Sequence, residues 1–411
     1  METVIYNIGF LAGVHAPLSP LRQQHLANLP VLQNAFLHIK NDSILNFGLM
    51  SEFNPPSDAK LLDAKGRSVL PSWCDAHTHL VFAQTREEEF VDKIRGATYA
   101  EIAQKGGGIL SSVKALRAIS AEALYEISLQ RLLDAAICGT GAIEIKSGYG
   151  LDVENELKML RVIRKLKQNS PVLIKSTFLG AHSFPPEYRE HRDKYVDLII
   201  QEMIPAIAAE GLADFIDVFC EEGFFTPEQT YRICKAGMLY GMKPKIHANQ
   251  LNASGGVEVG IELGALSVDH LESMNASAIS TLKNSNTIGT LLPTAAFFLR
   301  MNYQPARTLI DEGCAIALAS DFNPGSSPGF NMNFVVSLAC IQMRMTPDEA
   351  INAATINGAF AMDVQDKVGS IHPGKLANII LTKPIRTLAA IPYHFSSNMI
   401  SNVMVKGQWL M

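Results

Sequence analysis

The stretch CDAHTHLVF, residues 74–82, places two histidines one residue apart behind an apolar run. Alternate side chains of an extended chain point to the same side, so the imidazoles of His77 and His79 face one way. We predict that this stretch ends a buried strand and offers two ligands to a divalent metal ion. Such a pair is a weak signal on its own, so the prediction depends on what other strands bring to the same place.

Strand-like runs alternate with helix-like runs downstream of this stretch. The eight strand candidates are residues 68–80, 141–150, 172–182, 214–223, 244–250, 265–272, 287–297 and 315–325. Between them, 152–168 carries an apolar stripe at helical spacing, and 226–241 opens with a Thr-Pro cap signal. Eight such units predict a distorted TIM (β/α)8 barrel, whose active site lies at the carboxyl ends of the strands. An open doubly wound sheet is the alternative, but no G-x-G-x-x-G motif follows the first strand.

Both ends of the chain show sequence patterns typical of short strands. Residues 35–48 form two strand candidates around a turn, and 375–384 and 401–411 form further ones. We therefore predict a small β-sandwich domain built from residues 1–67 and 366–411, and a catalytic barrel domain from residues 68–365. The segment 85–120 is an insertion after the first barrel strand, in which 105–109 is expected to form a flexible loop near the barrel mouth.

The composition excludes several classes of protein. The chain has 411 residues, is 47% apolar and 18% charged, and carries a formal net charge of -5 without a basic stripe, which argues against binding to nucleic acid or to an anionic membrane. It contains no apolar window long enough for a membrane span and no N-terminal signal peptide pattern. Its six cysteines are scattered without a C-x-x-C pair, as in a reduced cytoplasmic protein.

Histidines recur where the predicted barrel strands end. Five of the eleven lie there, namely His77, His79, His182, His247 and His270. The other six are interpreted as surface or packing residues, namely His15, His25, His38, His191, His372 and His394. With Asp321 at the end of the eighth strand, three imidazoles and a carboxylate are a ligand set for Zn²⁺ or Fe²⁺. Taken singly, His247 fits a packed core and Asp321 fits an Asx-turn.

Several long motifs resemble one family. They are DAHTHL, HTHLVFAQTREEEF, GATYAEIAQKGGGI, EIKSGYGL, TFLGAHSFPPEY, HANQL, VDHLE, SDFNPGSSP and VGSIHPGKLANIIL. The chain resembles the imidazolonepropionases of the amidohydrolase superfamily from end to end. The resemblance implies metal-dependent hydrolysis of the ring C–N amide bond of 4-imidazolone-5-propanoate, giving N-formimino-L-glutamate in the third step of histidine degradation. It also implies one divalent metal, Zn²⁺ or Fe²⁺/Fe³⁺, a small-molecule substrate and a homodimer.

The resemblance also assigns roles to individual residues. The metal ligands are His77, His79, His247 and Asp321. The substrate-binding residues are Arg86, Tyr149, His182, Gln250, Asn323, Gly325 and Ser326. Catalytic roles fall to Asp321, His270 and His182. The chain departs from the family pattern at Asn249, where an acidic residue is expected, and at Asn378, which replaces an aspartate in the terminal β domain.

Alternatives remain open at this point. A nucleobase deaminase on the same scaffold would use the same metal ligands but would not need Arg86 with Tyr149, and a non-catalytic barrel would have lost ligands. Without the resemblance, Arg86 fits a solvated charge beside Glu87–Glu89. Lys146 and Lys175 do not end the fourth strand, where a metal-bridging lysine belongs, so we predict a mononuclear site. The residues do not distinguish zinc from iron, nor the proton-transfer roles of Asp321 and His270.

Overall fold

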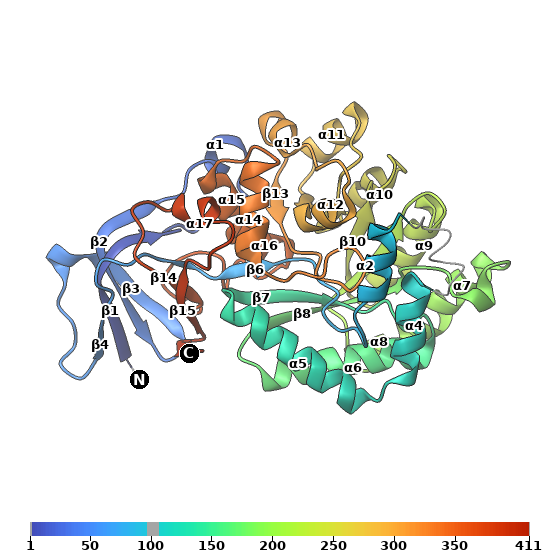
Figure 1. Cartoon of the computed structure of the whole chain (residues 1–411), viewed down its shortest axis with the longest axis horizontal. Helices are drawn as coiled ribbons and strands as arrows, with labels where there is room; N and C mark the ends of the chain where they lie inside the picture. The colour runs from blue at the N-terminus through green and yellow to red at the C-terminus, as the bar shows by residue number, and fades with distance from the viewer. Residues whose placement is uncertain (1, 97–106, 411) are drawn as a thin grey trace.

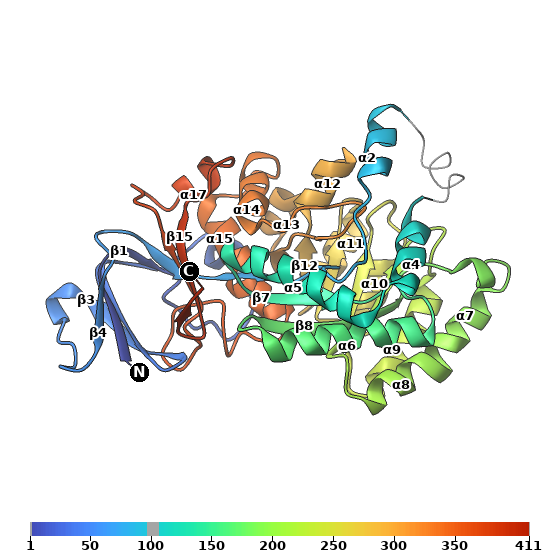
Figure 2. The same cartoon turned by 60° about the horizontal axis from the view of Figure 1, so that its bottom comes forward.

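A computed structural model describes residues 2–96 and 107–410 (Figure 1). Its larger part is a barrel of parallel strands hydrogen-bonded in chain order. The strands are β6 (Trp73–Asp75), β7 (Thr140–Lys146), β8 (Leu173–Ala181), β9 (Phe215–Cys220), β10 (Lys243–Ala248), β11 (Ser267–His270), β12 (Ile288–Leu291) and β13 (Ile316–Leu318). Helices surround these strands in both views (Figures 1 and 2), which confirms the predicted (β/α)8 barrel.

The barrel closes just beyond the ends of its first and last strands. Thr78 forms a parallel bridge with Phe322. On either side of this bridge, the amide of Asp321 donates to the His77 carbonyl at 3.0 Å, and the amide of His79 donates to the Phe322 carbonyl at 2.9 Å. The predicted metal ligands therefore lie on the seam that joins the two ends of the barrel sheet.

The predicted strand ranges run longer than the strands themselves. The candidate 68–80 contains two strands, β5 (Val69–Pro71) and β6, and only β6 belongs to the barrel. The candidate 287–297 is wrong in its second half, because helix α12 (Pro293–Leu299) begins there. Pro293 suits the first turn of a helix, where a missing N–H leaves no hydrogen bond unmade.

Most helices of the barrel follow the strands in alternation. They are α2 (Glu87–Ile94), α4 (Ile109–Ala118), α5 (Ala121–Ile137), α6 (Val153–Asn169), α7 (Arg192–Leu198), α8 (Ile204–Ala209), α9 (Pro227–Met238), α10 (Gly256–Glu262), α11 (Ala276–Lys283), α12, α13 (Ala306–Glu312), α14 (Met332–Ile341), α15 (Pro347–Ala354) and α16 (Ile356–Ala361). Shorter elements are α1 (Gln23–Leu26), α17 (Ala390–Tyr393), the 3₁₀ turns η1 (Met50–Glu52) and η2 (Pro186–Tyr188), and the π-helical η3 (Ile199–Met203). The Thr226 cap predicted for α9 is present as a capping box with Gln229.

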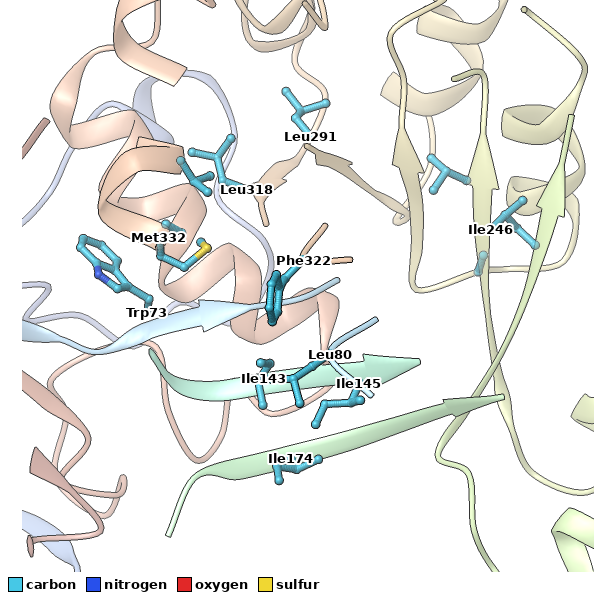
Figure 3. Close-up of a cluster of buried hydrophobic side chains, with 14 of the residues drawn as sticks. Trp73, Leu80, Ile143, Ile145, Ile174, Ile246, Leu291, Leu318, Phe322 and Met332 are labelled. Atoms are coloured by element: carbon cyan, nitrogen blue, oxygen red, sulfur yellow. The ribbon is translucent and has the colours of Figure 1, made fainter. Parts of the chain in front are cut away.

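The main core fills the space between strands and helices. Ile143 on β7, Ile174 on β8, Ile246 on β10 and Leu291 on β12 belong to one cluster of buried side chains (Figure 3). Burying an aliphatic side chain of this size stabilises a fold by about 1.5–3 kcal/mol. Strands packed this firmly give the loops at one end of the barrel a rigid base.

Both ends of the chain contribute strands to a second, mixed sheet (Figure 1). Its strands are β1 (Glu2–Ala12), β2 (Val31–Lys40), β3 (Ser43–Leu49), β4 (Lys60–Asp63), β5, β14 (Ile379–Thr382), β15 (Ile400–Val405) and β16 (Gln408–Trp409). It encloses its own core, which includes Ile5, Leu37 and Ile379. A terminal β unit is thus confirmed. We propose residues 1–67 with 366–411 as this unit and 68–365 as the barrel domain, from which only β5 joins the terminal sheet.

Three smaller observations complete the fold. The six cysteines are free, and four of them are buried. Among the described residues, no helix combines the length and apolar character needed to cross a membrane. Of the loop predicted at 105–109, residues 105 and 106 lie outside the described part of the chain.

Candidate metal centre

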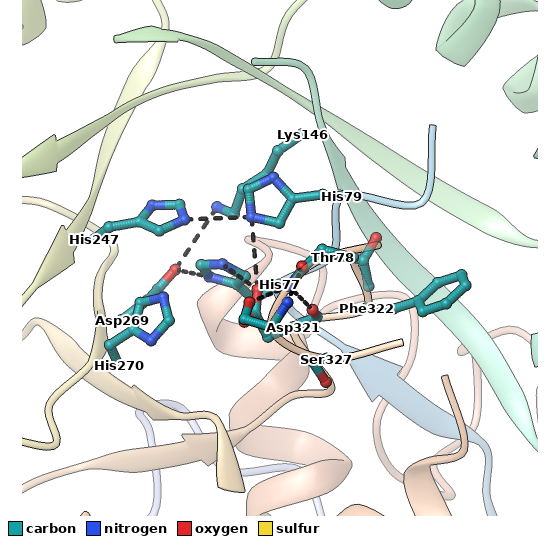
Figure 4. Close-up of polar contacts among 12 residues, drawn as sticks. His77, Thr78, His79, Lys146, His247, Asp269, His270, Asp321, Phe322 and Ser327 are labelled. Carbon is teal, nitrogen blue, oxygen red and sulfur yellow. Dashed lines mark hydrogen bonds and ion pairs between the residues drawn. The ribbon is translucent and has the colours of Figure 1, made fainter. Parts of the chain in front are cut away.

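Three imidazoles and a carboxylate meet at the barrel seam. Ring nitrogens of His77, His79 and His247 all lie within 4.8 Å of one another. The Asp321 Oδ1 lies 3.5 Å from the His77 Nε2 and 3.6 Å from the His79 Nε2. Figure 4 shows these side chains turned toward a common point, although they come from β6, β10 and β13 or the residues that follow them. The predicted ligands therefore converge.

Two of the converging atoms have no hydrogen-bond partner in the part of the chain that the structure describes. All four side chains are buried, and the His77 Nε2 and the Asp321 Oδ1 have no hydrogen-bond partner among the described residues. Leaving two such atoms unpaired is unfavourable unless a cation fills the space between them. Burial also lowers the pKa of His77 and of His79 well below the ordinary value, which keeps both rings in the neutral form that metals bind. The donor set fits Zn²⁺ or Fe²⁺.

Two buried carboxylates hold the ligand histidines from behind. The Nδ1 of His77 lies 2.7 Å from the Asp269 Oδ2, and the Nδ1 of His247 lies 2.9 Å from the Asp217 Oδ2. A proton held at Nδ1 leaves the Nε2 lone pair free, which is the usual arrangement behind metal-binding histidines. Both Nε2 atoms therefore keep a lone pair that can bind a metal ion.

A charged network inside the barrel supports these carboxylates. Lys146 Nζ donates to Asp217 at 2.7 Å and to Glu144 at 2.6 Å, and it lies 3.7 Å from Asp269. Lys245 Nζ donates to the other oxygen of Glu144. Burial alone would lower the pKa of Lys146, but the surrounding carboxylates outweigh it and raise that pKa. Lys146 is thus a buried cation beneath the site.

The candidate site residues share one cavity of about 620 Å³. All of them line it except His77, whose ring is packed against that of His79 with centroids 5.4 Å apart. They are His79, Arg86, Tyr149, His182, His247, Gln250, His270, Asp321, Asn323, Gly325 and Ser326. A cavity of this size accommodates a small organic molecule.

His182 and Tyr149 form one wall of the cavity. The His182 ring stacks on that of His79 with centroids 5.0 Å apart, and its Nδ1 lies 3.0 Å from the Gly148 carbonyl. Burial lowers the pKa of His182 to about 3, so the ring is neutral, and a proton on Nδ1 leaves Nε2 as an acceptor. Buried Glu156 accepts hydrogen bonds from the amides of Gly148, Gly150 and Leu151 and so fixes the loop that carries Tyr149.

His270 differs electrostatically from the other histidines. Burial would lower its pKa, but Glu272, whose Oε1 lies 3.5 Å from the His270 Nδ1, outweighs this effect and the pKa is raised. Gln304 holds that carboxylate oxygen in place through a 2.8 Å hydrogen bond. His270 therefore carries a proton more readily than the metal-facing rings do. Opposite it, burial raises the pKa of Asp321 to about 7.

The loop after Asp321 is a turn built by Asn323. The Asn323 Oδ1 accepts the amides of Gly325 and Ser326, each at 2.8 Å, and the Ser326 Oγ lies 3.3 Å from the Asp321 Oδ2. The Arg86 guanidinium lies directly over Gly325, because a Cβ on that glycine would come within 2.0 Å of Nη2. The same turn thus joins the metal-facing aspartate to the predicted carboxylate-binding arginine.

The two departures from the family pattern have local explanations. Asn249 is fully buried at φ 55°, a left-handed conformation that asparagine tolerates well. The Asn378 amide donates to the Gly141 carbonyl and its oxygen accepts the Lys406 amide, a combination that an ionised aspartate does not offer. Neither side chain takes part in the metal cluster. Of the two glutamates at the end of β9, Glu221 is buried and accepts the Leu251 amide beside Gln250, whereas Glu222 is exposed.

Sequence reasoning missed the residues behind the ligands. They are Glu144, Asp217, Lys245, Asp269, Glu156 and Glu272, and Lys146 was considered only as a metal-bridging group. The sequence did contain a signal for these residues. Charged residues are unusual in the middle of buried parallel strands, and so is a glutamate on the apolar stripe of α6, one turn before Leu160.

Comparison with known proteins agrees with this geometry. The sequence pattern of the amidohydrolase family matches residues 68–410. The imidazolonepropionase of Flavobacterium johnsoniae is 54% identical over 409 residues, which cover 99% of this chain and 100% of that protein. That of Geobacillus kaustophilus is 44% identical over 403 residues, covering 97% and 94%.

Solved structures share the fold at much lower identity. The guanine deaminase of E. coli superposes with a TM-score of 0.75 at 13% identity, covering 100% of this chain and 99% of that one. A triazine hydrolase variant gives 0.75 at 14% identity, covering 99% and 94%. These likenesses show the barrel with its terminal sheet, whereas the full-length matches at about half identity show the family. The chain belongs to the imidazolonepropionases, a branch of the metal-dependent amidohydrolase family.

Proposed function

We propose that this enzyme hydrolyses the ring C–N amide bond of 4-imidazolone-5-propanoate and releases N-formimino-L-glutamate. The observation that carries the proposal is one cavity with a histidine–aspartate cluster on one wall and Arg86 on another. An amide ring bearing a propionate tail needs both features, a centre that activates water and a cation for the carboxylate.

We propose a single metal ion, Zn²⁺ or Fe²⁺/Fe³⁺, held by His77, His79, His247 and Asp321. Bound there, it would lower the pKa of a water molecule toward 7 and polarise the ring carbonyl. The two oxygens of Asp321 have separate tasks in this scheme. Oδ1 faces the histidine nitrogens, and Oδ2, which lies 3.3 Å from the Ser326 Oγ, takes the proton from the water.

The water oxygen adds to the carbonyl carbon, the ring C–N bond breaks, and the departing nitrogen takes up a proton. Asp321 returns the proton it accepted. His270, with its raised pKa, donates a hydrogen bond to the carbonyl oxygen as negative charge develops there. Gln250 hydrogen-bonds the ring, but its amide does not titrate and is no general base.

The remaining contacts orient the substrate. Neutral His182 accepts a hydrogen bond from a ring N–H, and Tyr149 donates its hydroxyl proton. Arg86 binds the propionate with its planar fork, and the turn of Asn323, Gly325 and Ser326 encloses the same end of the molecule. The ring is thereby directed toward the metal cluster.

The test is direct. We would purify the enzyme, measure its metal content, and follow the absorbance of imidazolonepropionate. Loss of absorbance with formation of formiminoglutamate is expected. Ammonia release from guanine or cytosine, with imidazolonepropionate unchanged, would instead support a nucleobase deaminase. Arg86→Ala should raise KM with little change in kcat, and an unchanged KM would remove Arg86 from the carboxylate site.

The cellular setting is part of the proposal. We propose a homodimer that acts in the cytoplasm, as the family resemblance implies, and free cysteines are consistent with a reducing compartment. Sedimentation of the purified enzyme and cell fractionation test the two statements separately.

A further inference from the structure

A second cation lies beside Arg86 in the cavity. Lys93 lies in the last turn of α2, and Arg86 is the residue that precedes the first turn of the same helix. Both line the cavity together with Asn323, Gly325 and Ser326. Lys93 has no part in the function proposed above.

The charges around these two cations do not balance. Glu89 Oε2 lies 3.3 Å from the Arg86 Nε, and its Oε1 also accepts the Gly108 amide at 3.0 Å. Within residues 2–96 and 107–410, no carboxylate lies within ion-pair distance of Lys93. Partial burial lowers the pKa of Lys93, and Arg86 lowers it further while Glu89 opposes this. One carboxylate for two cations leaves an excess positive charge at this end of the cavity.

Gly325 brings the two cations to one place. The Arg86 guanidinium lies over its Cα, and the Lys93 Nζ lies 3.4 Å from its carbonyl oxygen. The Asn323 Oδ1 accepts a hydrogen bond from the backbone amide of this glycine and so fixes its position. The cations therefore approach a single rigid residue from two directions, and an anion beside Gly325 lies within reach of both.

We infer that Lys93 is a second carboxylate-binding residue, which acts with Arg86 to select substrates that carry an acidic tail. This inference rests on the proposed function and extends it. Arg86 supplies a planar fork and Lys93 a point charge, so the pair binds one carboxylate from two sides. Because both contacts are to the carboxylate tail and not to the ring amide, they contribute to binding and specificity rather than to the chemical step.

The test compares Lys93→Met with Arg95→Met in the metal-loaded enzyme. Arg95 is exposed and follows the same helix, so the control removes an equal charge away from the cavity. We expect Lys93→Met to raise KM for imidazolonepropionate about 10-fold or more with kcat nearly unchanged, as for loss of a charge-assisted hydrogen bond. Lys93→Arg should restore most of the affinity, and Arg95→Met should behave as the wild type.

A second measurement does not depend on turnover. Glutarate, a simple dicarboxylate, should bind to the wild type in calorimetry and bind about tenfold more weakly to Lys93→Met, while Arg95→Met binds it normally. If the enzyme fails on imidazolonepropionate but this glutarate pattern holds, the proposed function fails and the carboxylate site stands. A KM and a glutarate affinity within twofold of wild type in Lys93→Met, or equal losses in Arg95→Met, would overturn the role of Lys93.

Discussion

The Asp269 Oδ2 lies 2.7 Å from the Nδ1 of His77 and 3.7 Å from the Lys146 Nζ, with all three side chains fully buried. One carboxylate thus connects a ligand histidine to a cation at the centre of the barrel. The candidate metal centre therefore depends on the barrel interior as well as on the loops at its mouth.

Lys146→Met should destabilise the protein by about 3–5 kcal/mol, because Glu144, Asp217 and Asp269 would keep buried charge without this partner. Lys175→Met is the matched control on the neighbouring strand, since Lys175 pairs with Asp214 in a partly exposed position and should contribute about 1 kcal/mol or less. Urea unfolding of the two variants measures the difference. Equal losses of unfolding free energy in the two variants would show that Lys146 contributes no more to stability than a partly exposed lysine does.

Asp321→Asn should keep the fold and lose turnover by about 10³-fold or more. The amide still accepts from Ser326 but neither ligates a metal well nor takes a proton. Circular dichroism checks the fold, and the absorbance assay checks kcat. A variant that keeps a tenth of wild-type kcat would rule out the proton-transfer role.

Gly325→Ala should displace Arg86, because the new Cβ would come within 2.0 Å of its Nη2. We expect KM to rise about tenfold with a smaller effect on kcat. Gly329→Ala is the control, as a Cβ there meets nothing within 4 Å. Similar kinetics in both variants would contradict the contact between Arg86 and Gly325.

Removing the metal should lower the thermal midpoint. Two buried atoms, the His77 Nε2 and the Asp321 Oδ1, would lose the cation that satisfies them. Free metal at 100 times its Kd adds about 2.7 kcal/mol of stability. Thermal melts after chelation, and again after Zn²⁺ or Fe²⁺ is restored, measure this contribution, and an unchanged midpoint throughout would argue against a metal at this cluster.

His15 predicts a pH effect remote from the active site. Burial first, and then the charge of Lys375, lower the pKa of His15 to about 4. The unfolded chain binds a proton at His15 near pH 6.5 and the folded chain does not, so this stabilisation is complete above about pH 6.5 and is lost as the pH falls toward 4. Between pH 7.5 and 5.0, wild type should lose about 1 kcal/mol more stability than His15→Gln, allowing for partial solvent exposure of the ring. Urea titrations of both proteins at the two pH values measure this difference. Equal losses of unfolding free energy in wild type and His15→Gln would refute the lowered pKa of His15.

The sequence predicted the parts of the molecule that follow simple local rules. Alternating strand and helix patterns located all eight barrel strands, and strand-end positions located His79, Tyr149, His182, His247, His270 and Asp321, which line one cavity, whereas Arg86, Gln250 and the Asn323 turn came from the family resemblance. It did not predict Asp217 or Asp269 behind the ligands. Their role depends on which strand side faces the barrel interior, and period-two alternation in short buried strands does not reveal that. Lys93 was missed because a lysine beside several glutamates on a helix is typical of a solvated surface.

The seam between Thr78 and Phe322 ties metal loading to the completion of folding. His77 and His79 follow the first strand of the barrel, whereas Asp321 follows the last, so the full ligand set exists only when the two ends of the sheet have found each other. A nascent chain that has emerged only as far as residue 300 has three imidazoles but not the carboxylate. With the ligand set proposed here, full coordination of the ion requires a closed barrel, so metal occupancy is expected to report the fraction of molecules in a preparation whose barrel has closed.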